Sequence, residues 1–286
     1  MEVFYVPEAL EQQPQIKAGE ISFVNYREND SPFKNRVVFN QYAISFVLNG
    51  QKEIYRATEN TIIKAGQAML IPAGNSIIAE HSLNQQQYHS LVAFFPAHVV
   101  SSFLAKHHIA LNSVNHSSDI APYIYFSCTP YLNEYLRGIE ALIEGGHQLS
   151  QSVAIHKLEE LLLVIYELFP VQLVNMFSRH QDTAGLSLKN LIEINLFNNL
   201  SLDELAFLAN RSRSSFKRDF EKAYSISPQK YIRDRKLEAA CSELAKGKQA
   251  SELYDAYGYE NLSNFSTAFK KKFGVTPAAY RQGMVA

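Results

Sequence analysis

Two stretches in the C-terminal third of this 286-residue chain combine basic side chains with small polar ones. Lysine and arginine neutralise phosphates, and short polar side chains bond to base edges when a helix presents them in the major groove. The same composition also fits an ordinary solvated helix face, which is the commoner explanation for one charged helix. The candidates for phosphate contacts are Arg211, Arg213, Arg235, Lys236, Lys270, Lys271 and Lys272.

The two stretches belong to an internal repeat with a period of 49 residues. Seven positions match at that offset, and the residues of each pair are chemically alike. A repeat of this length indicates a duplicated supersecondary unit, and the duplication favours nucleic-acid binding over a coincidental polar face. The pairs are Phe216 and Phe265, Phe220 and Phe269, Tyr224 and Phe273, Ile226 and Val275, Ser227 and Thr276, Pro228 and Pro277, and Tyr231 and Tyr280.

Each copy predicts two short helices joined by a tight turn, which is the helix-turn-helix arrangement. In the first copy, residues 201–204 have the spacing of a capping box, Asn210 provides the turn, and Ser212 caps the second helix. In the second copy, Gly258 provides the turn and Asn261 the cap. The second helix of each copy is the predicted recognition helix.

The segment between the copies predicts one continuous helix that begins at Ser227-Pro228 and ends at Gly247. A proline at the first helical position costs no hydrogen bond. About 19 residues span roughly 28 Å at 1.5 Å per residue. Major grooves on one face of DNA lie about 34 Å apart. The helix is therefore long enough to hold two recognition helices one DNA turn apart.

Residues 201–281 resemble the DNA-binding region of the AraC/XylS family of bacterial transcription regulators. The resemblance rests on motifs such as Phe-Lys-Arg-Asp-Phe at 216–220 and Phe-Gly-Val-Thr-Pro at 273–277. It implies sequence-specific binding to double-stranded DNA and activation through contact with RNA polymerase. It also implies which residues read bases: Arg213, Ser214, Lys217 and Arg218 in the first half-site, and Ser263, Asn264, Ser266 and Thr267 in the second.

One position departs from the family pattern. The family usually has alanine where this chain has Tyr254, and Ala206 fills the matching place in the first copy. A small residue there lets two helices approach closely, so the tyrosine is expected to displace something. We expect Tyr254 to affect the angle of the second recognition helix.

The distribution of charge divides the chain in two. Residues 186–286 hold 16 Lys and Arg against 11 Asp and Glu, while residues 1–185 carry a net charge of −6. This balance fits a DNA-binding domain over 186–286 and a sensing or dimerisation domain over 1–180, with a polar linker at 180–185. The sequence shows neither signal-peptide features nor an apolar run of membrane-spanning length, so we expect a cytoplasmic protein without membrane association.

The segment 21–95 predicts many short strands, since it is rich in β-branched and aromatic residues. Asn49-Gly50 is the strongest hairpin cue among its turns, and residues 65–74 resemble the cupin-like N-terminal domain of the same family. The expected fold class is α+β: an N-terminal cupin-like β-barrel with a helical hairpin, then an all-α domain of two helix-turn-helix motifs joined by a linker helix. The strands are expected at 21–24, 36–39, 43–48, 52–55, 61–64, 68–71, 76–79 and 90–95.

Helical patterns follow the strands. The helix over 151–169 is amphipathic, and its apolar stripe includes Leu158, Leu161 and Leu162. That stripe either packs within its own chain or forms the interface of a homodimer; the pattern alone allows both. The other helices are expected at 97–106, 130–144, 171–179 and from Ser187 to about Asn198.

The N-terminal domain shows no catalytic or metal-binding pattern. Metal-binding cupins carry His-x-His and Glu soon after the first glycine of the motif, and residues 75–81 lack that spacing. We expect His81 and His89 to be surface or hydrogen-bonded residues, with no metal or other cofactor. A nucleophile elbow and a phosphate-binding glycine loop are also absent from the sequence. A transcription regulator is therefore favoured over an enzyme or a purely architectural DNA protein.

The N-terminal domain is expected to receive the regulatory signal, either a small organic effector or a regulatory protein. An effector would be mainly apolar or aromatic, held without metal between the strands. Phe23, Phe46, Tyr55 and Met69 alternate with polar neighbours and so point to one interior. There they either line a pocket or simply fill the space.

Overall fold

The computed structural model describes residues 2–28, 34–82, 87–109, 124–178 and 187–283. The chain divides into two compact units, Met1–Ala184 and Gly185–Ala286, and each is described by itself below. The linker expected at 180–185 lies outside the described residues.

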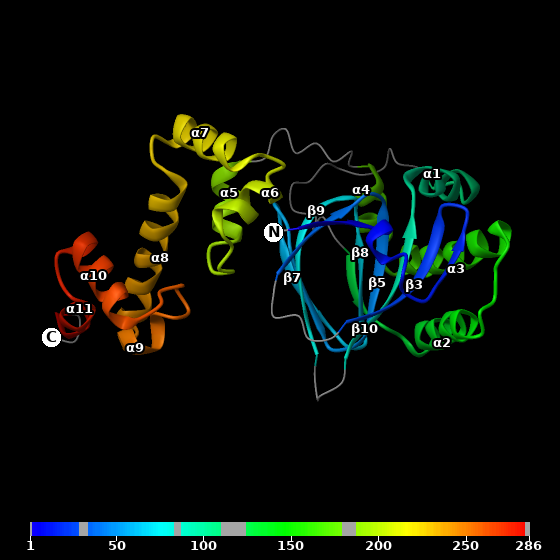
Figure 1. Cartoon of the computed structure of the whole chain (residues 1–286), viewed down its shortest axis with the longest axis horizontal. Coiled ribbons are helices and arrows are strands. Elements are labelled where there is room, and N and C mark those ends of the chain that lie inside the picture. The colour runs from blue at the N-terminus through cyan, green and yellow to red at the C-terminus, as the bar shows by residue number, and fades with distance from the viewer. Residues whose placement is uncertain (1, 29–33, 83–86, 110–123, 179–186, 284–286) are drawn as a thin grey trace. The chain divides into compact units, whose positions relative to one another are not determined.

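The N-terminal unit contains two β-sheets that enclose one apolar core (Figure 1). Eight of the strands are those that the sequence predicts. The five-stranded sheet has the order β1 (Val3–Val6), β4 (Asn35–Phe39), β9 (Gly74–His81), β6 (Gln51–Tyr55) and β7 (Asn60–Lys64). The six-stranded sheet has the order β11 (Ile124–Ser127), β8 (Gln67–Ile71), β5 (Tyr42–Asn49), β10 (Tyr88–Phe95), β3 (Ile21–Glu28) and β2 (Gln15–Ala18).

The predicted barrel is not confirmed, because the two sheets do not close on each other. The strands β1, β2 and β11 are additions, each only four residues long. Of the described strand pairs, β1 with β4 is parallel and the others are antiparallel. Strand β1 leads into a single 3-10 turn, η1 (Glu8–Leu10).

The hairpin expected at Asn49-Gly50 is wrong. Strand β5 before it belongs to the six-stranded sheet, and β6 after it belongs to the five-stranded one. Gly50 has a φ of +89°, and a Cβ there would lie 2.5 Å from the carbonyl oxygen of His81. The glycine is thus needed for a tight crossover between sheets, a geometry that a short-range hairpin signal does not distinguish.

The described residues of the N-terminal unit also form four α-helices: α1 (Ala97–Lys106), α2 (Pro130–Glu144), α3 (Gln151–Leu168) and α4 (Pro170–Ser178). Helices α2 and α3 contact β2 and β3 of the six-stranded sheet. The apolar stripe of α3 is buried in this unit's own core, with Leu158, Leu161 and Leu162 at most 1% exposed. Most of the stripe therefore packs within its own chain, and only Leu168 at its C-terminal end is exposed, at 49%.

No single helix among the described residues combines the length and the apolar composition that crossing a membrane requires. Helices α3 and α4 would meet that requirement only as a pair, and they are bent by 116° at their junction.

The histidines of the sheets are as expected: the side chain of His81 is 40% exposed, and His89 is hydrogen-bonded. His81 Nε2 lies 3.4 Å from a carboxylate oxygen of Glu53. His89 Nε2 bonds to the side-chain oxygen of Asn25 and lies 3.5 Å from Glu140. Burial lowers the pKa of His89. Within the described parts of the chain, no three potential metal ligands gather around one point.

The C-terminal unit is entirely helical where it is described. The predicted helices are confirmed with two differences. The first ends at Ile194 and not near Asn198. The first helix of the second motif, which the sequence predicts to include Leu253, Ala256 and Tyr257, ends at Leu253. The buried side chains Phe216, Phe220, Phe265 and Phe269 have no exposed surface. The helices are α5 (Leu188–Ile194), α6 (Leu202–Leu208), α7 (Arg213–Tyr224), α8 (Pro228–Ala245), α9 (Ala250–Leu253), α10 (Leu262–Phe273) and α11 (Pro277–Gly283).

Candidate nucleic-acid interface

Helices α7 and α10 are structural copies of each other. The side chain of Ser212 accepts a hydrogen bond at the start of α7, and that of Asn261 does the same for α10. Both helices end in a left-handed residue, Ser225 with φ 56° and Gly274 with φ 78°. The N-terminal caps of the two helices are 49 residues apart, and so are their left-handed C-terminal residues. The sequence repeat is therefore also a structural repeat.

The first helices of the two motifs match at an offset of 48 instead. Leu205 of α6 corresponds to the buried Leu253 of α9, and the turn residue Asn210 corresponds to Gly258. Both turn residues have positive φ, 54° and 77°. The turn before α10 is therefore one residue longer than the turn before α7. The sequence motifs missed this difference because they lie mainly in the second helices.

Tyr254 lies where the second motif departs from the first. Helix α6 has seven residues, whereas α9 has four and ends at Leu253, directly before Tyr254. The tyrosine is half-buried and packs against the core formed by α8, α9 and α10. Its backbone remains right-handed helical, with φ −54° and ψ −43°. The change from alanine to Tyr254 thus coincides with a shorter first helix in the second motif, α9. Helix α10 has the same length as α7.

The outward face of α7 carries exposed arginines held only by weak ion pairs. Arg213 lies 3.3 Å from Asp203, and Arg218 lies 3.3 Å from Asp219. The side chain of Arg218 is 73% exposed. Exposed ion pairs contribute about 0–1 kcal/mol, so a phosphate or a guanine can replace these partners at little cost.

Further polar groups adjoin these arginines on the same helix. Arg211 lies 3.6 Å from Asp219, Ser214 is exposed in the first turn, and Lys217 is half-buried. The structure thus brings the predicted residues of the first motif together on and beside one helix. Their mixture of long cations and a hydroxyl suits a helix that contacts both bases and phosphates.

Helix α10 presents shorter side chains in its early turns. Ser263, Asn264 and Thr267 are exposed, and Ser266 is half-buried. The backbone N–H of Asn264 donates to the cap, 2.8 Å from the Asn261 oxygen, so its side chain does not serve as the cap itself. At the other end of the helix, Lys270 and Lys271 are exposed. The predicted residues of the second motif therefore also share one helix.

Three of the predicted phosphate contacts have partners that tie helices together. Arg235 forms two hydrogen bonds with Glu193, at 2.7 and 3.1 Å, and one with Glu238 at 2.8 Å. Lys272 donates to Glu238 at 2.9 Å, and Lys236 donates to the side chain of Asn199 at 3.0 Å. These contacts link α8 to α5, to α10 and to the segment after α5.

Glu193 is the centre of this network, and sequence reasoning did not identify it. It accepts hydrogen bonds from Arg235 and from the hydroxyl of Tyr231. The Arg235 hydrogen bonds lower the pKa of Glu193. The pair Arg235 and Glu238 has a spacing that a helix pattern could reveal. Glu193 lies 42 residues from Arg235 in sequence, and no local pattern connects them.

Comparisons with known proteins cover both units. The family described as "ExsA N-terminal regulatory domain" matches residues 42–174, and a family described as "Helix-turn-helix domain" matches residues 205–283. The HTH-type transcriptional regulator ExsA of Pseudomonas aeruginosa is 22% identical over 246 residues, which cover 83% of this chain and 84% of that protein. The virulence regulon transcriptional activator VirF of Yersinia enterocolitica is 22% identical over 263 residues, covering 90% and 94%.

Among solved structures, an apo form of ToxT from Vibrio cholerae aligns with 93% of this chain and 98% of its own. The alignment has a TM-score of 0.43 and 16% sequence identity.

Proposed function

Because the chain belongs to the AraC/XylS family of transcription regulators, we propose that it activates transcription by placing α7 and α10 in successive major grooves of duplex DNA. The carrying observation is the pair of like-capped helices, each with an exposed polar face, on a connecting helix of 18 residues. Eighteen residues span about 27 Å at 1.5 Å per residue. Side chains at both ends add the reach that a separation of about 34 Å requires.

The base contacts in this proposal come from the middle and early turns of each recognition helix. Arginine and lysine bond to guanine O6 and N7, and asparagine bonds to adenine. We therefore assign stricter reading to α7, with its charged side chains, and looser reading to α10. The proposed readers are Arg213, Ser214, Lys217 and Arg218 on α7, and Ser263, Asn264, Ser266 and Thr267 on α10.

The phosphate contacts in this proposal fall into two groups. Arg211, Lys270 and Lys271 are the direct anchors, since their charges lie at or near the surface. Arg235, Lys236 and Lys272 keep their internal partners and act first by holding the helices in place. Their charge still adds to the attraction for DNA, because long-range steering does not require direct contact.

Activation is proposed to require contact with RNA polymerase, in keeping with the relative named as a transcriptional activator. The N-terminal unit is proposed to receive the signal and to pair two copies of the chain, and neither unit is proposed to catalyse a reaction. The buried stripe of α3 is not available for pairing. Exposed apolar residues nearby are Val153, Leu168 and Val171, which are 43–52% exposed.

A binding-site selection followed by footprinting tests the main proposal. Duplexes selected from a random pool by the full-length protein are probed with hydroxyl radicals. We expect two protected patches on one face of the DNA, about one helical turn apart. Asn264→Ala should weaken one patch and leave the other. Protection of only one groove, or no selection of any sequence, would contradict the proposal.

A further inference from the structure

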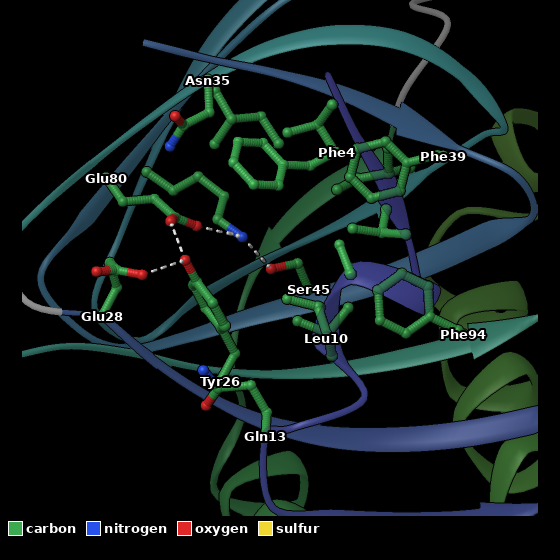
Figure 2. Close-up of a pocket in the computed structure, with 17 residues that line it drawn as sticks. Phe4, Leu10, Gln13, Tyr26, Glu28, Asn35, Phe39, Ser45, Glu80 and Phe94 are labelled. Carbon is green, nitrogen blue, oxygen red and sulfur yellow. Dashed lines mark hydrogen bonds and ion pairs between the residues drawn. The ribbon is translucent and has the colours of Figure 1, made fainter. Parts of the chain in front are cut away.

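The N-terminal unit contains a cavity of about 200 Å³ between its two sheets (Figure 2). An apolar cavity of about 150 Å³ is large enough to bind benzene, so this one has room for a slightly larger molecule. Its wall includes residues of both sheets and of the N-terminal segment β1–η1. Phe23, Phe46 and Met69 do not line it. They lie in the filled core with no exposed surface, which is one of the two arrangements that the sequence allows.

The cavity has an apolar side and a polar side. Figure 2 shows the rings of Phe4, Phe39 and Phe94 on one side, and the carboxylates of Glu28 and Glu80 on the other. A cavity with one apolar and one polar side suits an amphipathic ligand. The apolar wall excludes water, and the few polar groups fix the orientation of the ligand.

The polar groups of the cavity form one connected cluster. Lys52 lies 3.2 Å from Glu80 Oε1 and donates to Ser45 Oγ at 3.2 Å, and its ammonium also lies 5.5 Å from the ring centre of Tyr88. The hydroxyl of Tyr26 lies 2.8 Å from Glu80 Oε2 and 3.2 Å from an oxygen of Glu28. Lys52 and Glu80 are only 5% and 6% exposed, so the cluster is built into the interior.

The cluster has two carboxylates that could accept the proton of Tyr26, but Tyr26 can donate to only one of them. A phenol has a single proton to donate, and Tyr26 lies between two carboxylates. Burial and the adjacent Glu80 raise the pKa of Tyr26, so the phenol keeps that proton. The shorter bond goes to Glu80. Among the described residues, Glu28 has no partner apart from Tyr26, and its negative charge is left without a cation.

The charge of the cluster also selects the ligand. The cluster has two carboxylates, Glu28 and Glu80, and one ammonium, Lys52. Lys52 forms its ion pair with Glu80. An anion entering the cavity would meet the field of Glu28 without a free cation to offset it. A cation would instead supply both the missing charge and the missing hydrogen-bond donors, since a primary ammonium has three.

We propose that this cavity binds a small primary amine whose ammonium pairs with Glu28 and whose apolar body lies against Phe39 and Phe94. The amide side chains of Gln13 and Asn35 border the same space and can accept further hydrogen bonds. The proposal replaces our expectation of a mainly apolar effector with one that carries a positive charge.

Titration calorimetry of the full-length protein with three small molecules tests the site. The probes are 2-phenylethylamine, the neutral 2-phenylethanol and the anionic 3-phenylpropanoate. We expect the amine to bind one per chain and at least about tenfold more tightly than either of the others, because a hydrogen bond to a charged group is worth more than a neutral one. Equal or tighter binding of the anion overturns the proposal, as does the absence of amine binding up to about 10 mM.

A pair of charge-removing variants locates the binding. Glu28→Gln keeps the shape of the side chain and removes its charge, whereas Glu167→Gln does the same on the exposed face of α3. Glu28→Gln should weaken the amine about tenfold or more and leave the alcohol unchanged. Equal losses in both variants, or none in Glu28→Gln, would place the amine elsewhere and overturn the assignment. No DNA is present in the assay, so its result is independent of the proposed function.

Discussion

The proposed function divides individual side chains on α7 and α10 into those that read bases and those that bind phosphates, and substitution can separate the two roles. Arg218→Ala should cost about 1–3 kcal/mol on the preferred DNA sequence and relax the preference at one position. Lys271→Ala should weaken all sequences alike and lower the dependence of log K on log salt by about one. Fluorescence anisotropy with matched and mismatched duplexes at several salt concentrations measures both effects. Uniform losses from both variants would refute the division.

Glu193 offers a second prediction at this scale, and it concerns stability. Glu193→Gln removes the charge that holds Arg235 and should lower the free energy of unfolding by about 1 kcal/mol, because the pair is partly exposed. The pKa of Glu193 is lowered in the folded state. Its stabilisation is therefore present above the ordinary carboxyl pKa of about 4.3 and is lost as the pH falls through the folded value.

Urea unfolding at neutral and acidic pH checks this expectation. The difference between the wild-type protein and Glu193→Gln should shrink as the medium becomes acidic. Glu260→Gln, which changes an exposed residue before the cap of α10, is the control and should match the wild type throughout. A gap between wild type and Glu193→Gln that is constant with pH would show that the carboxylate charge is not responsible.

At the scale of elements, the ends of α7 and α10 provide matched positions with unlike residues. Ser225 adopts a left-handed conformation that costs a residue with a Cβ about 1–2 kcal/mol, whereas Gly274 adopts it freely. A Cβ at Gly274 would meet no atom within 4 Å, so only the backbone strain matters there. Gly274→Ser should lower the free energy of unfolding by about 1 kcal/mol.

The reciprocal change, Ser225→Gly, should raise the free energy of unfolding slightly. The relief of strain exceeds the extra entropy of an unfolded glycine by only a few tenths of a kcal/mol. Thermal unfolding monitored by circular dichroism compares both variants with the wild type. Opposite shifts in Tm are expected, and shifts of the same sign would contradict the strain argument.

The elements also show what the sequence can and cannot predict. The strand and helix patterns identified eight strands and the helices of both motifs, because periodicity and caps are local. The hairpin prediction at Asn49-Gly50 was wrong because a local turn pattern does not determine whether the next strand joins the same sheet or the other one. The cluster around Tyr26 was missed for a related reason: Tyr26 and Glu80 are 54 residues apart, and only the packing of two sheets brings them together.

Across the whole C-terminal unit, α8 determines the separation of the two recognition helices. Inserting 5 bp between the half-sites turns the second half-site to the opposite face of the DNA, since one turn takes about 10–10.5 bp. We expect the affinity to fall about 10- to 100-fold, through loss of the contacts made by one helix. The same 5 bp placed outside the two half-sites is the control and should have no effect. Unchanged affinity after the central insertion would mean that the helices are not held by a rigid connection.

The additional residue in the turn before α10 has a consequence for the DNA. The two motifs descend from one pattern, yet they differ in that turn, in the length of the first helix and in the side chains that face outward. The two DNA-binding motifs of one chain are therefore not equivalent, so one bound chain has a defined direction along the DNA. Its target should be neither a palindrome nor a direct repeat, but a directional sequence. Reversing such a site would turn the bound protein to face away from the promoter that it serves.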